Sequence, residues 1–212
     1  MAPQYVDRFT ELLCSRLCHD LISPLGAINN GVEIVGEGDP SVLSDAIALI
    51  GSSARKATAR LAYFRLAFGG WGSEPASSFG SIRKAVELHF DEKKSPIIWS
   101  KPGTADETAV EKDAAKLLLN LLLVAAECAQ REAKIDVSAE FDGGKPRLHI
   151  AVQGERCKLR DDVRTGFVDA MSSGDLTVRN VIAQHCQRLC GSLGVTLAIA
   201  EPAPNSIEFK VG

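Results

Sequence analysis

Near the N-terminus a histidine is followed directly by an aspartate, within the segment RLCHDLISPL at residues 16–25. A carboxylate that accepts a hydrogen bond from one imidazole nitrogen fixes the tautomer and leaves the other nitrogen unprotonated. The free nitrogen of His19 would then be a nucleophile near neutral pH, with Asp20 orienting the ring. Arg16 and Ser23 would lie beside the imidazole, because residues three and four positions apart share one face of a helix.

A long amphipathic helix over residues 6–35 must carry this pair. Its apolar positions, spaced three or four apart, are Val6, Phe9, Leu13, Leu17, Leu21, Leu25, Ile28, Val32 and Val35. His19 lies two residues from two members of this stripe, which places it on the opposite, exposed face. Pro24 has no N–H to donate to the carbonyl of Asp20, so we expect the helix to bend beside the histidine.

A second helix should follow a tight turn. Gly36 and Gly38 should end the first helix, and Asp39 with Pro40 should begin the next as N-cap and first helical residue. The apolar positions of the second helix are Leu43, Ile47, Ile50, Ala54, Ala57, Leu61, Phe64 and Phe68. The sequence therefore predicts an antiparallel helical hairpin, whose uncovered apolar surface a second copy would bury in a dimeric four-helix bundle.

The hairpin geometry brings basic residues to the level of the histidine. With the turn centred near Gly38, His19 should lie level with about Thr58, which Lys56 and Arg60 flank. These side chains would either contact a phosphate or an acidic partner, or form an ordinary charged surface. The pattern leaves both interpretations open.

The rest of the chain has a different pattern. Residues 1–70 form the predicted hairpin domain, residues 71–79 read as a linker rich in Gly, Ser and Pro, and residues 80–212 form a second domain. The expected helices cover residues 82–90, 109–130 and 178–189, and the expected strands cover residues 96–100, 134–141, 147–153, 195–199 and 206–211. This order predicts an α/β sandwich with helices over one face of a mixed sheet.

Composition excludes several classes of protein. The 212 residues are 45% hydrophobic and 24% charged, which is typical of a soluble globular chain of one or two domains. A net charge of −3 gives no general attraction to nucleic acid or to an anionic membrane. No segment approaches the ~20 apolar residues of a membrane span, and the N-terminus has no leader pattern, so we expect a cytoplasmic protein.

The sequence contains six cysteines, namely Cys14, Cys18, Cys128, Cys157, Cys186 and Cys190. Two pairs have four-residue spacing, which on a helix could present two thiolates to a metal ion. Neither pair has the two-residue spacing of a zinc ribbon, so we expect small, buried and reduced side chains and no metal site.

The segment HDLISPL resembles the H-box of sensor histidine kinases, in which a histidine, an acid, a leucine and a later proline recur in this order. The resemblance implies that His19 is the phospho-acceptor, Asp20 its assisting acid and Pro24 the proline that bends the helix. Ser23 occupies a position where many of these kinases have threonine or asparagine, so the resemblance does not carry phosphatase activity over. The second domain resembles the ATP-binding domain of the same kinases.

The nucleotide-binding residues of that domain are missing. Val124 stands where the kinases have an asparagine that holds magnesium, and valine has no oxygen to ligate a hard cation. Gly154, Arg156 and Lys158 occupy the segment where an aspartate binds adenine. Of the glycine-rich phosphate lid only Gly174 is left. We therefore expect neither a nucleotide cofactor nor a metal ion in this chain.

Together, an intact histidine and a degenerate nucleotide site resemble the dimeric ChpT-type histidine phosphotransferases of bacterial phosphorelays. The resemblance implies that His19 takes phosphate from the receiver domain of a CckA-type hybrid kinase and passes it to CtrA- and CpdR-type response regulators. Magnesium would come with the receiver. The alternatives are an ATP-dependent sensor histidine kinase with differently aligned motifs, or a non-catalytic dimeric scaffold in which His19 is incidental.

Overall fold

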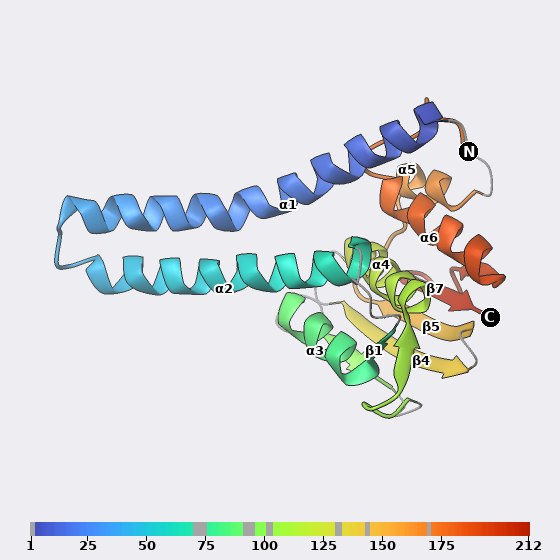
Figure 1. Ribbon diagram of the computed structural model, residues 1–212. Coiled ribbons are helices and arrows are strands. Elements are labelled where there is room, and N and C mark those ends of the chain that lie inside the picture. The colour runs from blue at the N-terminus through green and yellow to red at the C-terminus, as the bar shows by residue number, and fades with distance from the viewer. Residues whose placement is uncertain are drawn as a thin grey trace.

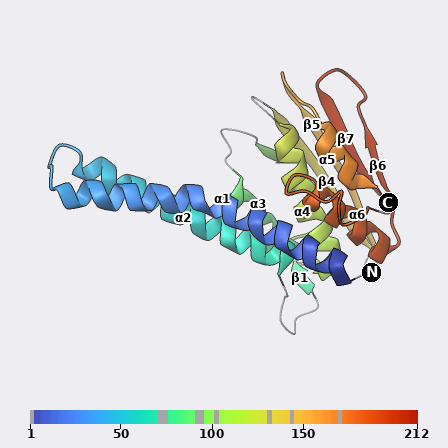
Figure 2. The same ribbon diagram turned by 90° about the horizontal axis from the view of Figure 1, so that it is seen from above.

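Two long antiparallel helices form the first part of the chain, and a sheet covered by helices forms the rest. The computed structural model describes residues 3–69, 76–90, 96–100, 104–129, 133–142, 145–168 and 171–212. Helix α1 (Pro3–Glu37) and helix α2 (Leu43–Phe68) lie side by side. They project from the sheet as a rod, with their connecting turn at the far end (Figures 1 and 2). The predicted helical hairpin is confirmed.

The turn between the two helices differs from the prediction. Gly38 has a φ of 73°, a left-handed conformation that favours glycine, and it ends α1 as expected. The prediction that Asp39 and Pro40 begin the second helix is wrong. The carboxylate of Asp39 instead accepts from the N–H of Ser41 at 2.8 Å, which stabilises a turn, and α2 begins only at Leu43.

The second part of the chain is built on a mixed sheet. The strands are, in spatial order, β2 (Ile97–Trp99), β4 (Lys134–Asp142), β5 (Lys145–Gln153), β7 (Ser206–Val211) and β6 (Leu197–Ala200). Strand β2 is parallel to β4, and the other neighbouring strands are antiparallel. Along β4 and β5 every second side chain is buried for most of the strand, for example Ile135 of β4 and Ile150 of β5.

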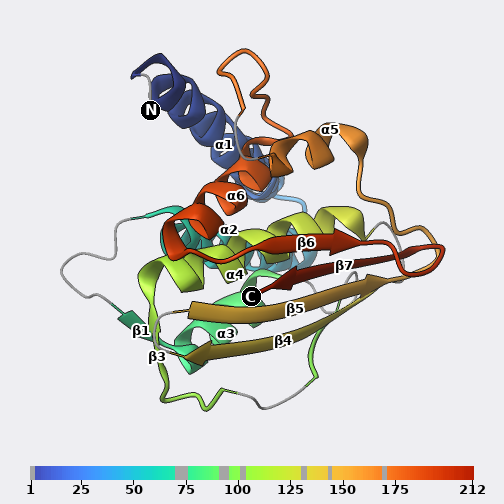
Figure 3. The same ribbon diagram turned by 90° about the vertical axis from the view of Figure 1, so that its right-hand side faces the viewer.

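Helices lie on one face of this sheet, which confirms the predicted α/β sandwich. Figure 3 shows α4 (Lys112–Cys128) and α6 (Val181–Leu193) above the same face. Helix α4 has a broad apolar surface, and its leucines from Leu117 to Leu122 are fully buried between the sheet and the neighbouring helices.

Two short strands lie in segments that the sequence predicted to be a linker and the start of a helix. Strand β1 (Ala76–Ser78) pairs antiparallel with β3 (Ala109–Glu111). Residues 109–111 were expected to begin the long helix, and they are a strand instead. Of the predicted linker, residues 71–75 lie outside the described residues, whereas residues 76–78 form β1. The division into domains stays a prediction.

Other helix boundaries also differ from the predicted ones. Helix α3 (Phe79–His89) begins before the predicted residue 82, because the Ser78 side chain caps it by accepting from the N–H of Ser81. Gly191 does not end the last helix as expected. It lies inside α6, whose last residue is Leu193. Gly194 caps the helix in a left-handed conformation with a φ of 64°. The sequence patterns did not indicate the single-turn α5 (Asp161–Arg164) or the 3-10 turn η1 (Thr165–Phe167).

The base of the hairpin shares a hydrophobic core with the sandwich. Phe9 of α1 and Phe64 of α2 are buried in the same cluster as the α4 leucines. Two hydrogen bonds join α2 to α4. The Tyr63 hydroxyl donates to the carbonyl of Leu119 at 2.7 Å, and the Asn120 side chain donates to the carbonyl of Ala67 at 3.0 Å.

The cysteines divide into two groups. Cys14 and Cys18 are exposed on α1, which contradicts the expected burial, whereas the other four are buried. Burial raises the pKa of Cys128 to about 12 and of Cys190 to about 11, so these thiols stay protonated at neutral pH. Within the described residues, no group of three or more potential metal ligands comes together. No helix among them is both long and apolar enough to cross a membrane.

Candidate functional site

His19 lies on the exposed face of α1, close to where the hairpin leaves the sandwich. Its side chain is 82% exposed, as its position opposite the apolar stripe predicted. Ser15 and Ser23, one turn away on either side, are exposed as well. Because both are small, a partner protein could approach the imidazole closely.

Asp20 contacts the imidazole. Its Oδ1 lies 3.3 Å from His19 Nδ1, and its side chain is only 28% exposed. An ionised carboxylate accepts hydrogen bonds and cannot donate them, so Nδ1 of a neutral imidazole carries the proton in this contact. The unprotonated nitrogen is then Nε2. The arrangement can therefore present a nucleophilic nitrogen to a partner.

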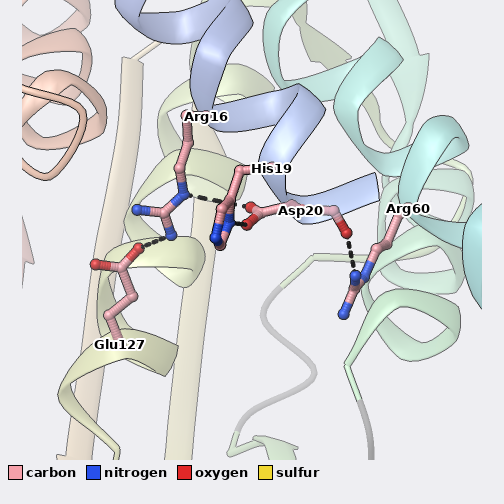
Figure 4. A network of polar contacts seen from close by, with 5 residues as sticks. All are labelled: Arg16, His19, Asp20, Arg60 and Glu127. Atoms are coloured by element: carbon pink, nitrogen blue, oxygen red, sulfur yellow. Dashed lines mark hydrogen bonds and ion pairs between the residues drawn. The ribbon is translucent and has the colours of Figure 1, made fainter. Parts of the chain in front are cut away.

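Arg16 lies on the other side of Asp20, and it reaches into the second part of the chain. Its Nε donates to Asp20 Oδ2 at 3.3 Å, and its Nη2 donates to Oε1 of Glu127 on α4 (Figure 4). Burial works against the charge of Arg16, but Glu127 and Asp20 outweigh it and raise the pKa of the guanidinium. Burial also raises the pKa of Glu127, which the positive charge of Arg16 partly offsets.

Sequence reasoning did not single out Glu127. It lies three residues beyond Val124, at the end of an apolar helix in which acidic side chains are rare. An acid in such a buried helix calls for a charged partner. This feature of the sequence could have identified Glu127 as a candidate, but it could not indicate which basic residue would pair with it.

Arg60 reaches α1 from the returning helix, at the level that the hairpin geometry predicted. Its Nη1 donates to the backbone carbonyl of Asp20. Pro24 is buried inside α1, and Figure 1 shows that the helix changes direction in its middle third, as expected from the proline. Lys56 is exposed, and no hydrogen bond or ion pair joins it to another residue in the described part of the chain.

Residues in the segments where the resemblance predicts degenerate nucleotide motifs have structural roles. Val124 is 1% exposed and packs in the core. The amide of Asn120 is fully buried and donates to the carbonyls of Ala67 and Lys116. A side chain on Gly154 would lie 2.7 Å from Ala133, so close packing explains that glycine. Val124 has no polar side-chain atom, and Asn120 uses its amide nitrogen within the protein, whereas its Oδ1 is buried without a hydrogen-bond partner among the described residues.

Comparison with known proteins decides the family. Residues 79–205 match the family model described as the histidine phosphotransferase C-terminal domain. Protein phosphotransferase ChpT of Brucella abortus (strain 2308) is 40% identical over 149 residues, which are 70% of this chain and 68% of that protein. The chain belongs to the ChpT-type histidine phosphotransferases.

The likeness to one solved structure extends over the whole fold. A solved 1.7 Å structure of a bacterial phosphotransferase superposes with a TM-score of 0.83 at 32% identity, and the match covers 100% of this chain and 98% of that one. The family model begins at the first residue of α3. In this ChpT-type chain, Glu127 therefore lies within the matched C-terminal domain, whereas His19 and Asp20 lie on the hairpin before it.

Proposed function

We propose that this chain is a histidine phosphotransferase of a bacterial phosphorelay, in which His19 takes a phosphoryl group from one receiver aspartate and gives it to another. The observation that carries the proposal is the contact between Asp20 and His19 Nδ1, which leaves Nε2 of an exposed imidazole free as the nucleophile. Membership of the ChpT-type family supports the reaction class.

The proposed step is an in-line displacement at phosphorus. Nε2 of His19 forms a bond to phosphorus while the bond from phosphorus to the donor aspartate oxygen breaks, and the aspartate leaves as a carboxylate. The proton stays on Nδ1, so the phosphorylated ring is positively charged and the carboxylate of Asp20 stabilises it. A second receiver aspartate then attacks the same phosphorus. Positioning and charge neutralisation dominate this chemistry.

This chain would need no metal ion or nucleotide of its own. In the proposal, magnesium is bound by the receiver domain and neutralises the phosphoryl oxygens. The degenerate nucleotide site supports phosphate transfer without ATP, because the buried Val124 has no oxygen to ligate a metal ion at the position where the kinases have an asparagine. The proposed donor is the receiver of a CckA-type hybrid kinase, and the acceptors are CtrA- and CpdR-type regulators in the cytoplasm.

The active form in this proposal is a homodimer. Five large apolar side chains of the hairpin are each 51–66% exposed in the single chain, namely Ile22, Leu25, Val32, Ile47 and Leu61. Exposed apolar surface of this kind is typical of an interface. A second hairpin would cover these side chains and complete a four-helix bundle.

The test is phosphate transfer from a labelled receiver domain, with wild type beside His19→Ala. We expect wild type to take label from the receiver and His19→Ala to take none. His149→Ala is the matched control, because His149 is an exposed histidine on β5, 45% exposed, and its loss should leave labelling unchanged. ATP alone should label none of these proteins.

Other outcomes would replace the proposal with one of its alternatives. Labelling of wild type by ATP alone would identify a sensor histidine kinase. If no receiver labels the wild-type protein, and His19→Ala binds receivers as well as wild type does, the protein would be a non-catalytic scaffold.

A further inference from the structure

Glu127 lies at a position where a charged carboxylate is energetically unfavourable. It lies in the last turn of α4, where the helix dipole presents its negative end, and its side chain is only 28% exposed. A largely buried carboxylate at such a position needs a cationic partner. The partner in the structure is Arg16, which comes from α1 and not from the sandwich.

Arg16 is shared between two carboxylates. Its Nη2 donates to Glu127, while its Nε donates to Oδ2 of Asp20 at 3.3 Å. The side chain of Arg16 is 20% exposed, so water competes little for these contacts. Glu127 therefore holds the guanidinium from one side and limits how it can approach Asp20 from the other.

The contact between Glu127 and Arg16 affects the imidazole of His19 through the second carboxylate oxygen of Asp20. Because Arg16 takes Oδ2, the other oxygen, Oδ1, is available to His19 Nδ1 at 3.3 Å (Figure 4). Without Glu127 the guanidinium could turn toward Asp20 and take both oxygens in the bidentate geometry that arginine favours. The contact that fixes the imidazole tautomer would then be lost.

We propose that Glu127 is a positioning residue for phosphate transfer, which acts through Arg16 and Asp20 to hold His19 with Nε2 unprotonated. This inference rests on the proposed function for its effect on rate. It gives the sandwich domain a part in the chemistry, because its helix α4 completes the set of contacts around a histidine of the hairpin.

The first measurement is the tautomer of His19 in the unphosphorylated protein. Long-range ¹H–¹⁵N correlation spectra at ~pH 8, where a free imidazole is neutral, report which ring nitrogen carries the proton. We expect wild type to show mainly the form with the proton on Nδ1. Glu127→Ala should shift the populations toward those of a free imidazole, and Glu127→Gln, which keeps the volume and one acceptor oxygen, should shift them less.

The second measurement is a double-mutant cycle on the rate of transfer from a phosphorylated receiver. We expect Glu127→Ala to lower the maximal rate about tenfold with little change in the receiver concentration at half-maximal rate. In an Arg16→Ala background, Glu127→Ala should cause no further loss, because its action passes through Arg16. Asp106→Ala is the control, since it breaks another ion pair of the sandwich, with Arg83 at 2.6 Å, and should leave the rate unchanged.

The outcomes separate this inference from the proposed function. An unchanged tautomer in Glu127→Ala, or an equal rate loss with and without Arg16, would show that Glu127 has only a structural role. A wild-type protein that accepts no phosphate would overturn the proposed function. The imidazole spectra would still decide whether Glu127 positions His19.

Discussion

Arg60 on α2 donates a hydrogen bond to the backbone carbonyl of Asp20 on α1. Within a regular helix that carbonyl accepts from the N–H four residues later, but the residue there is Pro24, which has none. The guanidinium therefore supplies the donor that the proline lacks. The bend of α1 and the contact between the two helices are linked at the residue that follows His19.

This relationship predicts that Arg60 and Pro24 are coupled. Arg60→Met should lower the free energy of unfolding by about 1–3 kcal/mol, because it leaves a partly buried carbonyl without a donor. The same substitution should cost much less in a Pro24→Ala background, since the introduced N–H can take the carbonyl of Asp20. Urea unfolding of the four proteins measures the coupling. Equal losses in both backgrounds would mean that the carbonyl does not need Arg60.

A second prediction concerns the apolar surface of the hairpin. Ile47→Asp should convert the proposed dimer into a monomer, because a charge at a 58% exposed apolar position cannot be buried against a second copy. Light scattering measures the mass, and circular dichroism checks that the helices persist. Leu88→Asp is the control, since Leu88 is 62% exposed on α3 and lies outside the hairpin. A wild-type protein that is monomeric at all concentrations would contradict the proposed dimer.

A third prediction concerns pH and His185. Its ring packs against Phe9 and Phe68, and neither ring nitrogen has a hydrogen-bond partner among the described residues. Burial, with the positive charges of Arg188 and Lys116 nearby, lowers the pKa of His185 to about 4. The folded state therefore resists protonation. The unfolded chain, with a histidine pKa near 6.5, binds the proton as the pH falls below that value.

The sign of the effect follows from this difference. The stability associated with neutral His185 is fully present above pH ~6.5 and is lost as the pH falls toward 4, by up to ~3 kcal/mol. His89, whose pKa burial lowers to about 4 as well, adds to the same decline. His185→Phe should reduce the pH dependence, which urea unfolding between pH 7 and pH 4.5 can measure. An unchanged slope in His185→Phe would mean that this histidine is accessible to protons in the folded state.

The local part of the candidate site could be predicted from the sequence. His19, Asp20 and Pro24 lie within two turns of one helix, so helical periodicity alone determines which of them is exposed. Arg60 could be placed as well, because a short turn fixes which residues of a hairpin face each other. The contact between Arg16 and Glu127 could not, since 111 positions separate the two residues and no local pattern encodes a pairing over that distance.

The errors in the predicted fold also arise because local sequence patterns do not encode contacts with distant residues. Residues 109–111 continue the apolar pattern of the following helix, and only pairing with the distant strand β1 makes them a strand. At Asp39 two local structures compete for one carboxylate, which can cap a helix or stabilise a turn. Residue types at that position allow both outcomes, and the packing of the hairpin decides between them.

The two hydrogen bonds between α2 and α4 run in opposite directions. Tyr63 of α2 donates to α4, and Asn120 of α4 donates back to Ala67 of α2. A slide of one helix along the other by a single turn, ~5.4 Å, would break both bonds at once and leave buried polar groups unpaired. The two bonds thus fix the position of α2 along α4, and with it the level at which the hairpin leaves the sandwich. In the proposed function, every receiver that docked there would meet the imidazole at the same distance from the sandwich.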